Sequence, residues 1–151
     1  MSLIHELENT NVYYDNLWDK EVKDRFCGKL GSLDKKDEKY FTQHWQGFAW
    51  ASIIGFINDK RIVLDSRKLT SFKFSTISRQ SPTIGDSLIL MAIAKSTKGE
   101  KILESPSEIL EIISEYAKGG AKIIKEIRET PGNENKFNIP DDYLAEIEDR
   151  K

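Results

Sequence analysis

The longest run of apolar side chains lies between Tyr40 and Ile57. Apolar residues recur there every three or four positions, the spacing of one helical face, at Phe41, Trp45, Phe48, Ala51 and Gly55. From Phe48 onward the opposite face is apolar too, with Trp50, Ile53, Ile54 and Ile57. A helix that is apolar all round is buried in a domain or a membrane, and a membrane span needs roughly 20 apolar residues. We therefore predict a central buried helix at about residues 38–57 of a soluble domain.

The clearest helix start lies further along the chain, at Ser105-Pro106-Ser107-Glu108. Here Ser105 is the cap, Pro106 takes the first helical position, and Glu108 can reach back to the cap amide. The glycine pair Gly119-Gly120 lies inside this apolar pattern. It predicts either the end of the helix, with another following, or a place where another backbone approaches closely.

Shorter helices are predicted on both sides of these two. One carries Val22, Phe26 and Leu30 at a spacing of four, and a glycine ends it. A second begins at Thr83, with Asp86 as its capping partner, and ends near residues 97–99. A last, acidic helix begins at Pro140.

One small β-hairpin at most is predicted, at about residues 60–77. The β-branched stretch Arg61–Leu64 would pair with a strand within Lys68–Ile77. The fold class is therefore mainly α: a single-domain bundle of five to six helices over residues 1–151. Residues 1–10 are a helical turn or a flexible arm, and residues 130–151 are a loop and a peripheral helix.

Length and charge limit the classes of protein. The 151 residues suffice for one domain with a core, and the net charge of −2 provides no overall basic field for nucleic acid. The first residues are partly acidic and contain no apolar signal region, so we expect a cytoplasmic protein without a membrane partner.

Residues suited to nucleophilic or acid–base catalysis are few. His5 and His44 are the only histidines, and we predict that His44 is an ordinary helix residue and not a general base. The single cysteine, Cys27, excludes an internal disulfide and a cysteine zinc site, and we expect a reduced, partly buried thiol. The sequence contains neither a phosphate-binding loop nor a GxSxG motif. We therefore predict that the protein is not an enzyme and holds no metal or cofactor.

Three glutamates share one side of the helix that begins at Pro106. Glu108, Glu111 and Glu115 are spaced by three and four residues, an arrangement that could hold a hard cation. The same arrangement is typical of a solvated helix face, which is our prediction.

The strongest local charge bias is a basic segment, residues 60–80. Its cations could neutralise phosphates while Phe72 and Phe74 stack on bases, which predicts contact with nucleic acid. The alternative is a hairpin with its aromatic rings inward and its cations in water. The candidate binding residues are Lys60, Arg61, Arg67, Lys68, Lys73 and Arg79.

The C-terminal helix is acidic with a narrow apolar stripe. Tyr143, Leu144 and Ile147 form this stripe, which either folds back on the chain's own core or docks in a partner's groove. These three residues are the candidate partner-binding residues.

Two stretches together resemble a known family. They are Phe48–Leu64, with Gly55-Phe56 near its middle, and Ile84–Lys98 followed by Ile112–Gly120. They resemble the Dnd system-associated proteins, small accessory proteins found near bacterial DNA-phosphorothioation gene clusters. The resemblance implies bacterial phage defence, a nucleic-acid-related process and work inside a protein complex. It brings no catalytic residues with it.

The sequence thus predicts a non-enzymatic accessory subunit that acts through protein–protein contacts. Its partner would be another protein of the same gene cluster or a second copy of the chain. The alternative is a nucleic-acid-binding module that uses the basic segment.

Overall fold

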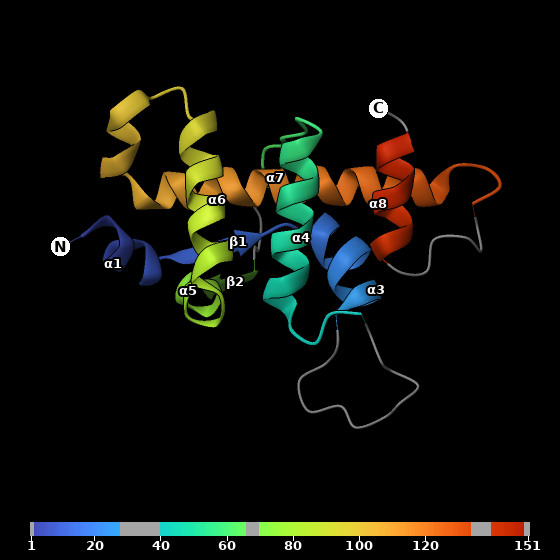
Figure 1. Cartoon of the computed structure of the whole chain (residues 1–151), viewed down its shortest axis with the longest axis horizontal. Coiled ribbons are helices and arrows are strands. Elements are labelled where there is room, and N and C mark those ends of the chain that lie inside the picture. The colour runs from blue at the N-terminus through green and yellow to red at the C-terminus, as the bar shows by residue number, and fades with distance from the viewer. Residues whose placement is uncertain (1, 28–39, 66–69, 134–139, 150–151) are drawn as a thin grey trace.

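The longest helix, α7 (Pro106–Glu129), is the axis of the fold. In the computed structural model, which describes residues 2–27, 40–65, 70–133 and 140–149, three helices cross one face of α7 (Figure 1). They are α6 (Pro82–Lys95), α4 (His44–Ile57) and α8 (Pro140–Asp149), and α4 lies between the other two. The mainly α prediction is confirmed.

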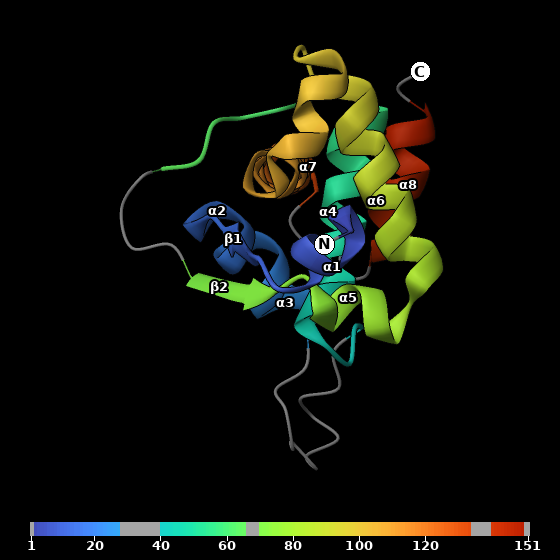
Figure 2. The ribbon, with the colours of Figure 1, turned by 90° about the vertical axis from the view of Figure 1, so that its left-hand side faces the viewer.

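The N-terminal segment lies on another side of α7, as the view along that helix shows (Figure 2). It consists of α1 (Leu3–Glu8), strand β1 (Asn11–Tyr14), and a helical run formed by α2 (Asn16–Trp18), a π-helical turn (Asp19–Lys23) and α3 (Asp24–Phe26). Strand β2 (Thr70–Lys73), α5 (Ser75–Gln80) and a 3-10 helix (Gly99–Glu104) complete the described elements. Leu7 is fully buried, so the first residues form a packed helical turn rather than a flexible arm.

The central helix begins later than predicted. Helix α4 starts at His44, not near residue 38, because Gln43 and Gln46 form a capping box. The amide of Gln43 donates to Oε1 of Gln46 at 3.1 Å. Toward α7 the helix buries Phe48, Ala51 and Ile54. In the described part of the chain, no helix combines the length and the apolar character needed to cross a bilayer.

Glycines allow α4 and α7 to touch backbone to backbone. A Cβ built at Gly120 would overlap the carbonyl oxygen of Ala51, and one at Gly55 would overlap that of Tyr116. A Cβ at Gly119 would overlap the carbonyl oxygen of Lys60. Helix α7 runs through the glycine pair without a break. Of the two alternatives for this pair, close backbone approach is therefore correct.

The predicted pairing of strands is wrong. Strand β2 pairs with β1 in antiparallel register, with Asn11 opposite Lys73, and residues 61–64 form no strand. Their polar groups bond to α7 instead: the amide of Ile62 donates to the Glu115 carbonyl at 3.2 Å, and Nζ of Lys118 donates to the Val63 carbonyl at 3.0 Å. The short stretch therefore runs beside a helix and not beside a strand.

Two helix starts differ in detail from the predicted caps. Ser81, not Thr83, caps α6: its hydroxyl accepts from the Ile84 amide at 3.3 Å, and Pro82 takes the first position. Helix α7 begins at Pro106 as predicted, but Glu108 pairs with Lys98 instead of the cap amide. The proline position marked the start better than the side-chain bonds did.

We predict that Gly120→Ala lowers the free energy of unfolding by about 2–4 kcal/mol, because the added methyl group meets a backbone oxygen that cannot rotate away. The control Glu126→Ala, on the exposed side of the same helix, should change it by less than about 0.5 kcal/mol. Denaturant unfolding followed by circular dichroism measures both. Equal stability of the two variants would contradict the close contact.

Candidate functional site

The solvent-facing side of α4 is apolar. Gln46, Trp50, Ile53 and Ile57 recur at spacings of four, three and four, so they lie on one stripe of the helix. Ile53 is 39% exposed and Ile57 is 51% exposed. The prediction of a helix buried all round is therefore wrong for these two residues, because α6 and α8 lie beside α4 and do not cover its outer face.

A groove runs along this stripe from Gln46 to Ile53. Its volume is about 580 Å³, and it is bounded by α4, by the segment at residues 40–42 and by Ile84 of α6. Several of its polar groups are already in use, since Oε1 of Gln46 accepts from the Gln43 amide and from the Thr42 hydroxyl at 3.2 Å, while the Trp50 indole nitrogen is buried. The groove therefore offers mainly carbon surface, a property of sites that bind apolar side chains.

Helix α8 lies along the other flank of the stripe. Tyr143 is fully buried, with its ring 6.4 Å from that of Trp50 and 5.7 Å from that of Phe26. Ile147 is also buried, so two of the three candidate partner-binding residues fill the chain's own core. The third, Leu144, is 40% exposed and is available to a partner.

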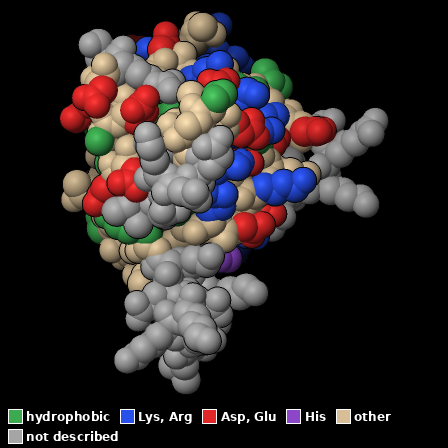
Figure 3. Space-filling view, turned by 90° about the vertical axis from the view of Figure 1, so that its right-hand side faces the viewer, with side chains coloured by type: hydrophobic (Ala, Val, Ile, Leu, Met, Phe, Trp, Pro, Cys, Tyr) green, Lys and Arg blue, Asp and Glu red, His purple; other side chains and the backbone are tan. Residues whose placement is uncertain are grey.

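The flank formed by α8 is strongly acidic. The helix contains five acidic and no basic residues. Its first turn lies against the groove, because the hydroxyl of Tyr40 donates to Oδ1 of Asp141 at 3.1 Å. Figure 3 shows the end of the molecule that carries α8. Acidic side chains gather at the left of this view, whereas at the right Lys and Arg are mixed with acidic side chains.

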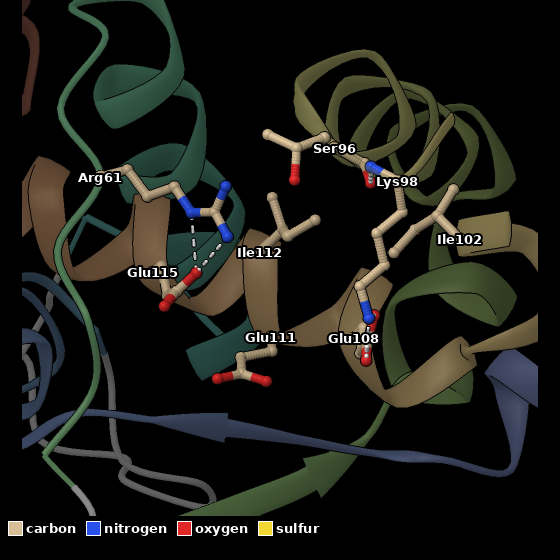
Figure 4. Close-up of a pocket in the computed structure, with 9 residues that line it drawn as sticks. Arg61, Ser96, Lys98, Ile102, Glu108, Glu111, Ile112 and Glu115 are labelled. Atoms are coloured by element: carbon tan, nitrogen blue, oxygen red, sulfur yellow. Dashed lines mark hydrogen bonds and ion pairs between the residues drawn. The ribbon is translucent and has the colours of Figure 1, made fainter. Parts of the chain in front are cut away.

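A second, charged pocket lies beside the N-terminal half of α7. It has a volume of about 230 Å³ and contains two ion pairs (Figure 4). Nε and Nη2 of Arg61 both lie 2.7 Å from Oε1 of Glu115, and Nζ of Lys98 lies 2.6 Å from Glu108.

The prediction of a solvated face is wrong for one of the three glutamates. The side chain of Glu115 is buried against Arg61, whereas Glu111 is exposed and Glu108 forms a largely exposed pair with Lys98. Within the described ranges, no group of three or more His, Cys, Asp or Glu residues lies together in a way that could hold a metal ion.

The structure separates the candidate nucleic-acid residues. Arg61 belongs to an extended segment at residues 60–65 and pairs with Glu115 beside α7, whereas Lys73 and Arg79 are exposed on β2 and α5 (Figure 2). The carbonyl of Lys60 packs on Gly119. Arg67 and Lys68 lie outside the described residues.

The aromatic residues of the basic segment face the core. Phe74 is buried, and the ring of Phe72 packs 5.3 Å from that of Phe48. Phe74 is therefore not free to stack on a base, and the partly buried Phe72 has one side against the core, which favours the alternative with rings inward. Nucleic-acid binding by this segment stays a prediction.

The histidines and the cysteine lie apart. His44 is the exposed first residue of α4, and His5 lies on α1. A pocket of about 360 Å³ beside His44 is lined by hydroxyl, amide and aromatic side chains, and the described part of the chain contributes no carboxylate to it. Cys27 is buried, and this burial raises the pKa of its thiol to about 12.

The fold and surface define a small mainly α domain whose largest described groove is apolar and lies beside its central helix. The family described as DNA sulphur modification system-associated protein 4 matches residues 22–139. The match covers most of the chain, so the protein belongs to this family, as the resemblance implied. No curated protein and no solved structure matches the chain.

Sequence reasoning located the helix that carries the groove but missed the groove itself. Trp50, Ile53 and Ile57 were assigned to a buried face because they are apolar. The available signal was their common stripe, which lies opposite Phe48, Ala51 and Gly55. A stripe of this kind shows which residues share a face but not what covers them.

We predict that Arg61→Ala lowers the free energy of unfolding by about 1–3 kcal/mol, because it leaves the buried Glu115 carboxylate without its partner. In the same pocket, Lys98→Ala removes an exposed pair and should cost less than about 1 kcal/mol. Thermal unfolding of both variants compares the pairs. An equal loss would show that burial does not distinguish them.

We also predict that Cys27 stays unlabelled by a thiol-reactive dye at pH 8, because a thiol whose pKa is about 12 is almost entirely protonated there. Labelling should follow when denaturant unfolds the chain. Rapid labelling of the folded protein would show that the thiol is accessible and ionised.

Proposed function

We propose that this protein is a non-catalytic accessory subunit of a bacterial DNA sulphur modification system, and that it binds another protein of that system through the groove beside α4. Membership of the family supports the association with the system. The apolar outer stripe of α4 carries the second half of the proposal. We further propose that the work of this system includes defence against phage.

The stripe supports protein binding for an energetic reason. Ile53 and Ile57 leave apolar surface in water, and covering such surface contributes roughly 25 cal/mol per Å². Trp50 gives the stripe an aromatic centre, and tryptophan is enriched among residues that dominate binding energy. A partner that covers all three residues would gain a small apolar interface core of the usual kind.

The chemistry of the described residues favours a binding role over catalysis. No carboxylate of the described residues lines the pocket beside His44, and the Cys27 thiol is buried and protonated. On α7, the buried Glu115 carboxylate is used in the ion pair with Arg61, and Glu108 is paired with Lys98. The groove, by contrast, has no structural occupant among the described residues.

We predict that Ile53→Asp weakens binding to the partner at least about tenfold, because it places a charge in an apolar interface. The assay mixes the purified protein pairwise with each purified product of the same gene cluster and measures binding by calorimetry. Ile53 is partly exposed, so the variant should fold, which circular dichroism checks.

The matched control is Val63→Asp. Val63 is 74% exposed and lies on the extended segment, away from the groove (Figure 2). This variant should bind as the unaltered protein does. Absence of binding to every product of the cluster, or equal loss in both variants, would refute the proposed function.

A further inference from the structure

The two helices that flank the outer stripe of α4 differ in charge, and this difference indicates the chemistry of the occupant of the groove. Helix α4 has no charged residue except its first, His44, when protonated, and α6 has one acid, Asp86, and one base, Lys95. Lys95 is engaged, because its Nζ lies 3.4 Å from Oδ1 of Asp59. Of the described helices on this face, only α8 therefore carries a net charge from its Asp, Glu, Lys and Arg residues, and that charge is negative.

One side of α8 faces the groove. Asp141 contacts Tyr40, which lines the groove, and Leu144 and Glu148 follow at spacings of three and four. These three residues thus form the groove side of α8, with an exposed apolar residue between two carboxylates. Asp149 is exposed on another side of the same helix.

We propose that the groove binds an amphipathic helix with a basic flank, supplied by the partner protein. This inference rests on the proposed function and deepens it. The apolar stripe of the partner helix would cover Trp50, Ile53 and Ile57, while its Lys or Arg residues would face Asp141 and Glu148. The stripe on α4 from Gln46 to Ile57 is about 16 Å long, which matches about three turns of a partner helix.

The acidic flank disfavours two other occupants. A second copy docked through the same surface would offer α8 no complementary charge, because its own α8 is acidic and its α6 has one acid and one base. Nucleic acid would bring its phosphates to the same carboxylates. A basic helix would instead place its cations beside these carboxylates, which is favourable.

The test uses two synthetic 18-residue helical peptides with the same leucine stripe, one flanked by lysines and the other by glutamates. Fluorescence anisotropy measures their binding to the full chain. We expect the lysine peptide to bind at least about tenfold more tightly than the glutamate peptide, and the difference to shrink at high salt. Equal affinities, or no binding of either peptide, would overturn the inference.

Matched variants locate the binding. Ile53→Asp should abolish binding of the lysine peptide, and Val63→Asp should leave it unchanged. Glu148→Lys should weaken it several-fold, whereas Asp149→Lys, the same charge change on another side of α8, should have a clearly smaller effect. Equal effects of the two charge reversals would show that the peptide responds to the overall charge of α8 and not to its groove side, and would overturn the inference.

Two outcomes would identify a different occupant, and a third would reject only the basic flank. A dimer in light scattering that Ile53→Asp dissociates would assign the groove to a second copy. Displacement of the lysine peptide from the groove by a short DNA duplex would assign it to nucleic acid. If a cluster product binds in an Ile53-dependent way but is indifferent to Glu148→Lys, the basic flank is wrong while the proposed function stands.

Discussion

The contact between the backbones of α4 and α7 determines how the rest of the molecule is arranged. Gly55 and Gly120 lie opposite carbonyl groups of the facing helix, where any side chain would overlap a backbone atom. Because the two helices meet so closely, the side chains beside the contact interdigitate, and Phe48, Ile54 and Tyr116 become core residues. The same contact fixes which side of α4 can face outward.

Buried charges attach the N-terminal segment to α7. Nζ of Lys118 lies 3.1 Å from Oδ2 of Asp15, and Nη2 of Arg128 lies 2.6 Å from Oε2 of Glu21. Burial raises the pKa of the Asp15 carboxyl, but amide hydrogen bonds from Leu17 and Asp65, together with Lys118, outweigh that effect and hold the pKa below its usual value. Asp15 therefore joins α2, α7 and the extended segment at residues 60–65 as an ionised group. It keeps the segment on the side of α7 away from the groove.

The parts of the fold that were predictable depend on local signals. Pro106 marks the start of α7 because proline suits the first helical position, and the apolar run marks α4 because helical spacing is visible over its length. The partner of β2 was not predictable, because it lies about 60 residues away in β1 and no local pattern specifies it. The wrong choice, residues 61–64, is β-branched in composition, but its polar groups are satisfied by Glu115 and Lys118.

The groove, like the pairing of β2, depends on contacts between residues that are distant in sequence, so no local pattern predicts it. Periodicity places Trp50, Ile53 and Ile57 on one stripe, but only the positions of α6 and α8 decide whether that stripe is covered. Since the opposite side of α4 is fixed on α7 by glycine contacts, α4 cannot rotate to bury the stripe without losing the core. Chain folding alone therefore leaves this apolar surface in water, next to a helix that carries five acidic residues. The two features call for one kind of complementary surface, apolar in the middle and basic at one edge.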